Sequence, residues 1–420
     1  MKYIILVGDG MADRPLKELG NKTCLQKAHT PNMDRLASEG KAGKVRTIPA
    51  GFEPGSDVAN LSILGYNPAI YYSGRAPIEA VYRGIKLGPK DVAFRCNLVT
   101  LDFLPPHPPL AKGGSSDIPT PAGSNAVMLD YSAGHITTNE ARLLIKDINN
   151  KLGSKDFIFY PGVSYRHLMI WKNGKEKIKC TPPHDITGKK IGGFLPQGKG
   201  AEILNVLMEQ STEILLSNSV NKNRIKKGLR PANSIWFWGQ GRQRPLPKFR
   251  DKYKLKGALI SAVDLTKGLG LCAGFDIVNV KGATGYIDTN YSGKAKAALK
   301  ALKQRDLVYV HVEAPDEAGH NGDMKIKIQA IEDFDSKVVG MVLKGLKKFK
   351  DYRILLLPDH ATPIKVRTHT PEPVPFVIYD GSVISKGRKT RGFSEDICRM
   401  KDVLSFEKGH KLMDYFIRVK

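Results

Sequence analysis

The stretch ILLLPDHATP, residues 354–363, decides the fold, and a further histidine, His369, follows it closely. Its four consecutive apolar residues, bounded by turn-forming residues, are typical of a buried strand in a parallel sheet. Asp359 and His360 come directly after this strand, at the end where open α/β sheets bind their ligands. A single Asp-His pair of this kind is more often a turn aspartate beside surface histidines. The functional interpretation therefore depends on matching pieces elsewhere in the chain.

Two other strand-like runs also lead into side chains that can bind a metal. Residues 307–312 are followed by Asp316 and His320, whose i, i+4 spacing places both on one face if this turn is helical. At the amino terminus, the apolar run of residues 3–7 ends at Asp9, which is flanked by glycines. The three strand ends together supply six candidate ligands, which are Asp9, Asp316, His320, Asp359, His360 and His369.

The chemistry of these ligands indicates the kind of metal. A mixture of Asp oxygens and His nitrogens suits zinc or manganese better than magnesium or calcium, which prefer shells made only of oxygen. Six ligands are more than one ion normally takes from a protein, so we expect two divalent ions. Mn²⁺ or Zn²⁺ is preferred and Mg²⁺ stays an alternative, because the ion bound in a cell depends on availability as well as affinity.

Ser56 is the candidate nucleophile. A loop rich in proline and glycine, residues 48–55, leads into an apolar helix pattern that begins at this serine. Ser56 is therefore expected beside backbone N–H groups and the positive end of a helix dipole. Local sequence favours a helix N-cap at this position. The alternative is a nucleophile whose alkoxide is stabilised by a metal and whose phosphoryl adduct lies at the helix end.

Five motifs resemble the alkaline phosphatase superfamily and, more narrowly, the archaeal-type cofactor-independent phosphoglycerate mutases. The resemblance runs from the first strand nearly to the C-terminus. The motifs are VGDGMAD around Asp9, TPNMDRLA at residues 30–37, PGSDVANLSILGY around Ser56, PDEAGH with Asp316 and His320, and DHATP followed by His369. The family implies an alkaline-phosphatase-like α/β core with a mainly parallel sheet flanked by helices. The TPNMDRLA stretch predicts a helix with Thr30 as its N-cap and Pro31 in its first turn.

The resemblance also implies roles for individual residues. Asp9, Ser56, Asp359 and His360 would hold one metal ion, and Asp316, His320 and His369 would hold the second. Ser56 would be phosphorylated while 3-phosphoglycerate and 2-phosphoglycerate interconvert, an isomerase reaction of glycolysis and gluconeogenesis that needs no 2,3-bisphosphoglycerate. PGSDVANLSILGY and SGRAP, residues 73–77, also resemble relatives proposed to be homoserine kinases. Homoserine kinase or another metal-dependent phosphotransferase is therefore the alternative function, since the metal site is common to both.

The length of the chain and its changing pattern predict two domains. A single hydrophobic core stops growing near roughly 250–300 residues, and this chain has 420. Between about residues 80 and 245 the apolar pattern changes and the ligand candidates stop. We therefore expect a metal-binding core of residues 1–80 and 246–420 with a smaller α+β domain, residues 81–245, inserted into it. The insertion contains a proline-rich loop at residues 104–121.

In the family that the chain resembles, the insertion shapes the substrate pocket. Arginine binds phosphate and carboxylate groups bidentately, and phosphoglycerate carries both. The substrate-binding candidates are accordingly Arg75, Arg95, His135 and Arg166. A surface ion pair is the alternative for each of them.

Composition limits the choice of partners and compartment. The 66 Lys and Arg against 41 Asp and Glu give a formal charge of +25, which attracts small acidic substrates. A lysine-rich solvated surface explains most of this excess, and no motif supports nucleic-acid binding. The five cysteines are scattered without a CxxC pair, and the first apolar run is too short for a signal peptide or a membrane span. We expect a cytoplasmic enzyme with a small phosphorylated substrate and no nucleic-acid or membrane partner. The sequence leaves the oligomeric state open.

Overall fold

A computed structural model of the chain describes residues 1–103, 125–382 and 392–418. The chain forms two compact units, the first made of Met1–Tyr72 and Pro245–Lys420 and the second of Ser73–Arg244. Residues 73–80, which the sequence analysis placed in the core, belong to the second unit. The proline-rich segment 104–121 lies outside the described residues.

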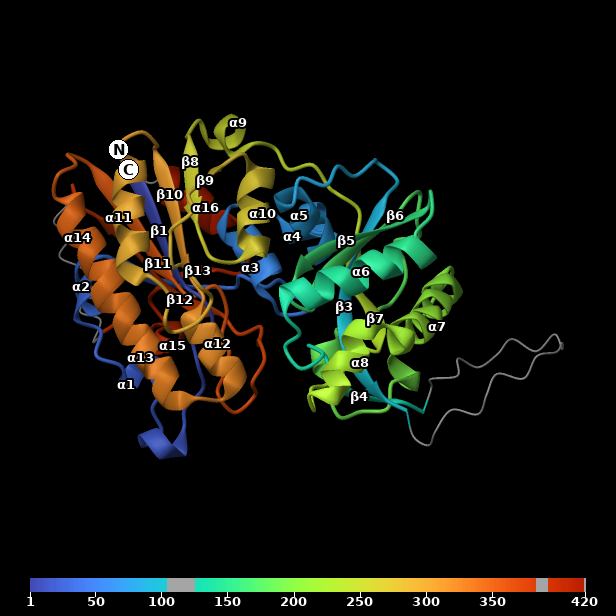
Figure 1. Ribbon diagram of the computed structural model, residues 1–420. Coiled ribbons are helices and arrows are strands. Elements are labelled where there is room, and N and C mark those ends of the chain that lie inside the picture. The colour runs from blue at the N-terminus through green and yellow to red at the C-terminus, as the bar shows by residue number, and fades with distance from the viewer. Residues whose placement is uncertain (104–124, 383–391, 419–420) are drawn as a thin grey trace, which may run out of the picture. The chain divides into compact units, whose positions relative to one another are not determined.

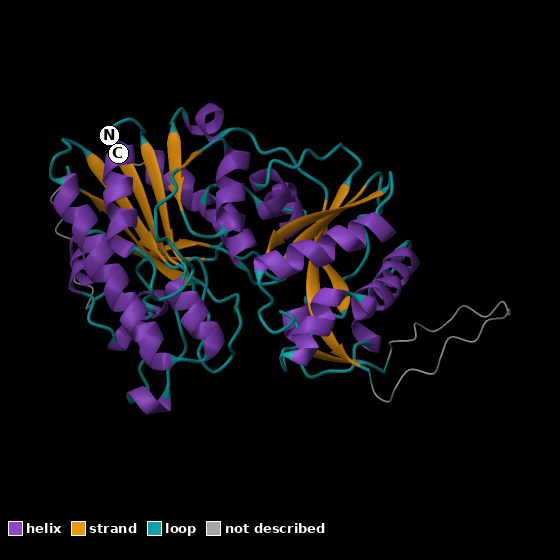
Figure 2. Cartoon of the chain, in the orientation of Figure 1, coloured by secondary structure: helices purple, strands orange, loops and turns teal. Residues whose placement is uncertain are grey.

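The first unit is built on an eight-stranded sheet. Its strands are β1 (Lys2–Gly8), β2 (Lys41–Val45), β8 (Gly257–Ile260), β9 (Asp276–Ile277), β10 (Leu307–Val312), β11 (Tyr352–Leu357), β12 (Val374–Asp380) and β13 (Leu404–Phe406). Their order is β13-β2-β12-β11-β1-β10-β8-β9. β12 runs antiparallel to both of its neighbours, and the other pairings are parallel. This mainly parallel sheet with flanking helices confirms the predicted α/β class (Figure 2).

The central strands of this sheet end at the same level. In β1, Val7 lies opposite Leu357 of β11, and the adjacent Gly8 lies opposite Val312, the last residue of β10. Helix α12 (Ala314–Asn321) begins two residues after β10. The aspartates that follow β1 and β11 therefore reach the same edge of the sheet as α12, as the sequence predicted.

Helices cover both faces of the sheet (Figure 1). Alternate residues of β1 divide between the faces, because side chains of a strand point to opposite sides. Ile4 and Leu6 join the main core under α1 (Cys24–Lys27), α2 (Pro31–Glu39), α11 (Tyr291–Leu302), α13 (Met324–Phe334), α14 (Gly340–Leu346) and α15 (Asp396–Arg399). On the other face, Tyr3 packs edge-on against Phe416, with ring centroids 5.4 Å apart. That face carries α3 (Ser56–Ile63), α10 (Asp264–Ala273) and α16 (Lys411–Arg418).

Thr30 occupies the N-cap position of α2, as predicted, but its side chain does not cap the helix. The helix begins at Pro31, as expected, but the side chain of Thr30 makes no capping hydrogen bond. Instead Asp335, in a π-helical turn between α13 and α14, accepts hydrogen bonds from the backbone amides of Met33 at 2.7 Å and Asn32 at 3.3 Å. The cap of this helix thus comes from a residue far away in the sequence.

The second unit is an antiparallel sheet covered by helices. Its strands are β3 (Val92–Asp102), β4 (Val127–Asp130), β5 (Phe157–Val163), β6 (Arg166–Trp171) and β7 (Ser234–Gly241), with β3 paired to β4, β6 and β7. One face of β3 shares a core with α6 (Thr138–Leu152), α7 (Ala201–Ser217) and α8 (Ser219–Lys226). The other face packs against Ala76 and Ala80 of α5 (Arg75–Tyr82), which explains why residues 73–80 belong here.

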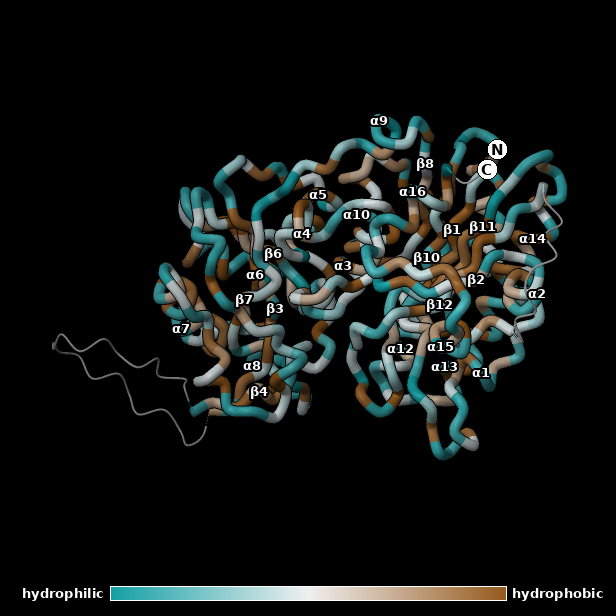
Figure 3. Tube along the Cα trace, turned by 180° about the vertical axis from the view of Figure 1, so that it is seen from behind, coloured by the Kyte–Doolittle hydropathy of each residue, from teal (hydrophilic) through white to brown (hydrophobic). Residues whose placement is uncertain are grey.

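The remaining short helices are α4 (Pro68–Tyr71) and α9 (Phe249–Tyr253), with 3₁₀ turns at Lys17–Leu19, Pro183–Ile186 and Gly192–Phe194. The hydrophobic colouring of β1 and β11 follows the buried sheet of the first unit (Figure 3). Among the described residues, no helix is long and apolar enough to cross a membrane. All five cysteines are free thiols.

Candidate metal centre

Three buried carboxylates meet at the carboxyl edge of the first sheet. Asp9, Asp316 and Asp359 are 1%, 4% and 0% exposed. Burial, followed by the neighbouring Asp359 carboxylate, raises the pKa of Asp9 well above its ordinary range. Buried like charges are costly without a compensating cation. A positive charge at this edge of the sheet would therefore strongly stabilise the three carboxylates.

His360 lies beside the two aspartates that follow β1 and β11. Its Nε2 is 3.4 Å from Oδ1 of Asp9 and 3.6 Å from Oδ2 of Asp359. Burial lowers the pKa of His360 to about 4, which Asp359 only partly opposes, so the ring is neutral at neutral pH. A neutral imidazole is the form that binds metal ions.

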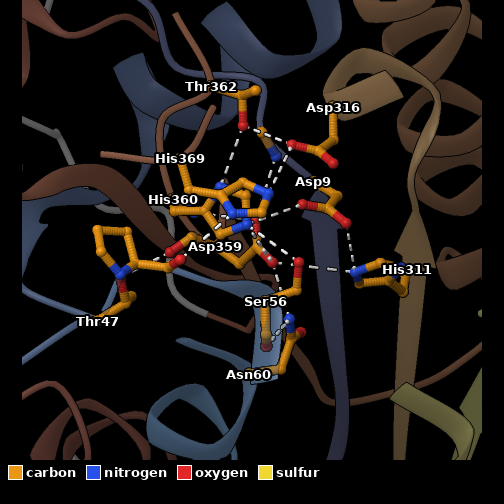
Figure 4. A network of polar contacts seen from close by, with 12 residues as sticks. Asp9, Thr47, Ser56, Asn60, His311, Asp316, Asp359, His360, Thr362 and His369 are labelled. Carbon is orange, nitrogen blue, oxygen red and sulfur yellow. Dashed lines mark hydrogen bonds and ion pairs between the residues drawn. The ribbon is translucent and has the colours of Figure 1, made fainter. Parts of the chain in front are cut away.

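His320 and His369 surround the third carboxylate. Nε2 of His320 is 3.2 Å from Oδ2 of Asp316, and Nε2 of His369 is 3.6 Å from its Oδ1. The two histidine Nε2 atoms are 3.0 Å apart. Burial alone would raise the pKa of Asp316, but the two imidazoles outweigh it and hold the pKa well below its ordinary range. The six ligand candidates predicted from the sequence thus all lie in this centre. Figure 4 labels Asp9, Asp316, Asp359, His360 and His369 there.

Ser56 is the first residue of α3, and the N-cap position is Gly55, so the N-cap interpretation of Ser56 is wrong. The serine is partly exposed, and its Oγ lies 3.1 Å from Nε2 of His360. This hydroxyl therefore points into the cluster of carboxylates and histidines rather than back onto its own helix (Figure 4).

Sequence reasoning missed three residues of the centre. His311 and Tyr309 lie in β10, and Asn60 lies one turn after Ser56 in α3. Asn60 Nδ2 donates to Oδ2 of Asp359 at 2.8 Å, and the hydroxyl of Tyr309 donates to Oδ1 of Asn60. The sequence contained one signal for two of them. His311 is two residues from Tyr309 in an apolar strand, so their side chains lie on the same face of that strand.

The residues present fit divalent metal ions. Two sets of potential ligand atoms each lie within 4.8 Å of one another, Asp316 with His360 and His369, and Asp9 with His311 and Asp359. Oδ1 of Asp9 and Nε2 of His311 are buried without a hydrogen-bond partner among the described residues. Unpartnered buried polar atoms are rare in folded proteins. A cation bound between these atoms would account for their lack of hydrogen-bond partners.

Comparisons with known proteins show the family of the chain. A family model described as 2,3-bisphosphoglycerate-independent phosphoglycerate mutase matches residues 37–221. A relative from Geobacter sulfurreducens, named a probable enzyme of this kind, is 50% identical over 417 residues, covering 99% of this chain and 100% of the relative. A relative from Methanosarcina acetivorans with the same enzyme name is 53% identical over 382 residues, 90% of each chain. The chain belongs to the family of 2,3-bisphosphoglycerate-independent phosphoglycerate mutases.

A solved structure supports the same family. The cofactor-independent phosphoglycerate mutase from Thermoplasma acidophilum aligns over 100% of both chains, with a TM-score of 0.61 and 27% sequence identity. These relatives of the phosphoglycerate mutase family do not favour the homoserine kinase alternative.

In this phosphoglycerate mutase family member, the four substrate-binding candidates lie in the second unit. Arg95 contacts both Glu79 oxygens, at 3.2 and 3.1 Å, and its guanidinium carbon lies 4.3 Å from the Trp238 ring centroid. The guanidinium carbon of Arg75 lies 5.8 Å from the same ring. Burial lowers the pKa of Arg95. The Glu79 carboxylate opposes this by raising the pKa, and the positive charges of Arg75 and Arg166 lower it further. The structure therefore groups the three arginines.

The fourth candidate, His135, lies elsewhere in the second unit. It is exposed in the turn between β4 and α6, and its backbone φ of 49° is in the left-handed region. Its backbone amide donates to Oγ of Ser132 at 3.2 Å. A histidine held in this conformation is uncommon, and such positions are often associated with function.

Proposed function

We propose that this chain is an isomerase that interconverts 3-phosphoglycerate and 2-phosphoglycerate without 2,3-bisphosphoglycerate, with Ser56 carrying the phosphoryl group. The observation that supports this most directly is the 3.1 Å contact between Oγ of Ser56 and Nε2 of His360, beside a buried pair of aspartates. A nucleophile next to metal-binding groups is the arrangement that phosphoryl transfer through a covalent intermediate requires.

Two divalent ions form part of this proposal. Asp9, Ser56, Asp359 and His360 would hold one ion, and Asp316, His320 and His369 would hold the other. The mixed oxygen and nitrogen ligands suit Mn²⁺ or Zn²⁺ better than Mg²⁺. When bound, the ions would lower the pKa of the Ser56 hydroxyl and stabilise negative charge on the transferred phosphoryl group.

Residues of the chain carry out the phosphoryl transfer itself. Oγ of Ser56 takes the phosphoryl group from the 3-hydroxyl of the substrate and later returns it to the 2-hydroxyl of the retained glycerate. Because Ser56 begins α3, its phosphoryl group would lie at the positive end of that helix, which favours anions. Two transfers to and from one serine need no nucleotide and replace one difficult transfer between two positions of the same substrate.

The second unit is proposed as the domain that binds the substrate. Arg75 and Arg95 lie over Trp238, and the charge of Arg166 acts on Arg95, so the three form a positive group that suits the carboxylate and phosphate of phosphoglycerate. Because Glu79 contacts Arg95 through both oxygens, we infer that Arg95 holds the group in place and that Arg75 and Arg166 contact the anion. His135 lies apart from this group and is proposed as a separate substrate contact. The formal charge of +25 would speed the arrival of such a substrate, and a cytoplasmic location is part of the proposal.

The test is the reaction itself with a matched pair of serine variants. The metal-loaded protein receives 3-phosphoglycerate without nucleotide or bisphosphoglycerate, and phosphorus NMR follows 2-phosphoglycerate. Ser56→Ala is expected to lose at least about 10³-fold in rate, because the covalent route depends on this oxygen. Ser62→Ala, on the same helix and fully buried, should keep near-normal rates.

Two outcomes would contradict the proposal. Normal turnover by Ser56→Ala would mean that this serine carries no phosphoryl group. A wild-type protein without mutase activity that phosphorylates homoserine from ATP would favour the alternative function.

A further inference from the structure

His311 lies inside the candidate metal centre, although it is not one of the predicted ligands. It is the fifth residue of β10, is 1% exposed, and lies on the same face of the strand as Tyr309, whose hydroxyl reaches Asn60 of α3. Its Nε2 is 3.2 Å from Oδ2 of Asp9 and 4.0 Å from Oδ2 of Asp359 (Figure 4).

We propose that His311 is a further metal ligand, whose Nε2 binds the ion held by Asp9 and Asp359. The inference rests on the proposed two-metal site and adds a ligand to it. The three side chains form one of the two sets whose potential ligand atoms lie within 4.8 Å of one another.

The distance between His311 and Asp9 suits two atoms that share an ion, whereas the 4.0 Å to Asp359 is slightly longer. Zinc binds histidine nitrogen and carboxylate oxygen at about 2.0–2.2 Å, so two ligands of one ion lie roughly 3–3.5 Å apart. The 3.2 Å between His311 and Asp9 falls in that range. Asp9 also presents its other oxygen, Oδ1, to His360 at 3.4 Å. The carboxylate thus lies between two histidines, each facing a different oxygen.

A hydrogen bond to Asp9 is a poorer explanation of this contact. Nε2 of His311 has no hydrogen-bond partner among the described residues, although Asp9 is 3.2 Å away. Hydrogen bonds weaken steeply when the donor hydrogen points away from the acceptor. A ring nitrogen that approaches a carboxylate without that alignment is better placed to direct its lone pair at a cation.

The surroundings of His311 can hold the ring in the form that binds metal. Its Nδ1 lies 3.4 Å from Oγ of Ser261, which already accepts a hydrogen bond from the amide of Val263 at 3.0 Å. If Nδ1 carries the proton and faces this oxygen, Nε2 keeps its lone pair for the metal, the usual arrangement around metal-bound histidines.

The experiment compares His311→Gln with His167→Gln in the full chain. His167 is a matched control, since it is also 1% exposed with an unpartnered Nε2 but lies in the second unit. Metal is removed by chelation, Mn²⁺ binding is measured by calorimetry, and X-ray absorption of the Co²⁺-loaded protein counts imidazoles per ion.

We expect the wild type and His167→Gln to bind two ions alike. His311→Gln should bind one of them at least about tenfold more weakly, with one imidazole fewer per two ions. His311→Glu restores a ligand atom and should bind more tightly than His311→Gln. A hydrogen-bonding role predicts the reverse order, because an amide can donate to Asp9 and a carboxylate repels it.

The outcomes separate this inference from the proposed function. Suppose that the wild type binds two ions. If His311→Gln binds them equally well, or binds them more weakly with an unchanged number of imidazoles, then His311 is not a ligand. The two-metal proposal stands in either case. If the wild type binds no divalent ion, the proposed metal chemistry fails and the inference fails with it.

Discussion

At the scale of single residues, Asn60 links the helix that begins at Ser56 to the carboxylate that follows β11. Its Nδ2 donates to Oδ2 of Asp359 at 2.8 Å and to the carbonyl of Ser56 at 2.7 Å, and its Oδ1 accepts from Tyr309. All three hydrogen bonds are made by one fully buried amide. Asn60 therefore fixes the direction in which Asp359 presents its oxygens, and such outer partners tune metal affinity.

Replacing Asn60 is expected to weaken metal binding. Asn60→Leu keeps a similar volume but leaves Oδ2 of Asp359 without its donor, so Mn²⁺ affinity measured by calorimetry should fall about 10–100-fold. Tyr309→Phe removes only the hydrogen bond to Asn60 and should have a smaller effect. Because both act through Asp359, the double variant should be no weaker than Asn60→Leu alone. Additive losses would mean that the two residues act separately.

The sequence predicted the residues at the ends of strands better than those inside elements. Asp9 and Asp359 could be assigned because parallel strands bring their carboxyl ends to one edge, which an apolar run followed by a polar residue reveals. Asn60 and His311 lie within a helix and a strand, where their role depends on α3 covering the Tyr309 face of β10. Nothing local encodes that pairing, so these residues required the structure.

At the scale of elements, the cap of α2 also depends on a contact that the local sequence does not encode. Thr30 stands at the position where a cap is expected, yet its hydroxyl donates to Asp34 at 3.3 Å and makes no capping hydrogen bond. Asp335 supplies the acceptor for the amides of Asn32 and Met33. The predicted helix was correct because its proline and apolar spacing are local, whereas its cap comes from another helical segment.

The two candidate caps are expected to differ in their contribution to stability. Asp335→Ala should lower the free energy of unfolding by about 1–2 kcal/mol, since it removes the acceptor and a negative charge at the helix start. Thr30→Ala should change it by less than about 0.5 kcal/mol. Urea unfolding followed by circular dichroism measures both. A larger loss from Thr30→Ala would restore the threonine as the cap.

At the scale of the whole molecule, two units have separate hydrophobic cores. The core of the first unit includes Ile4 and Phe334, and that of the second includes Phe94 and Trp236. The sequence predicted an insertion from the change of apolar pattern and the loss of ligand candidates after about residue 80. Neither signal shows which sheet a short helix packs against. The N-terminal change falls between Tyr72 and Ser73, because α5 packs against the second sheet.

All the proposed metal ligands belong to the first unit, so metal should stabilise that unit alone. At a free ion concentration about 100 times the Kd of each site, each ion adds about 2.7 kcal/mol to the folded state, so two ions add about 5.4 kcal/mol. For a unit of this size each kcal/mol raises the melting temperature by about 2–4 °C. In scanning calorimetry of the full chain, Mn²⁺ should therefore raise one transition by roughly 10–20 °C relative to chelator and leave the other in place. Leu144→Ala, in the core of the second unit, should lower only the transition that does not respond to metal. A single transition that moves as a whole with both metal and Leu144→Ala would mean that the two cores unfold together.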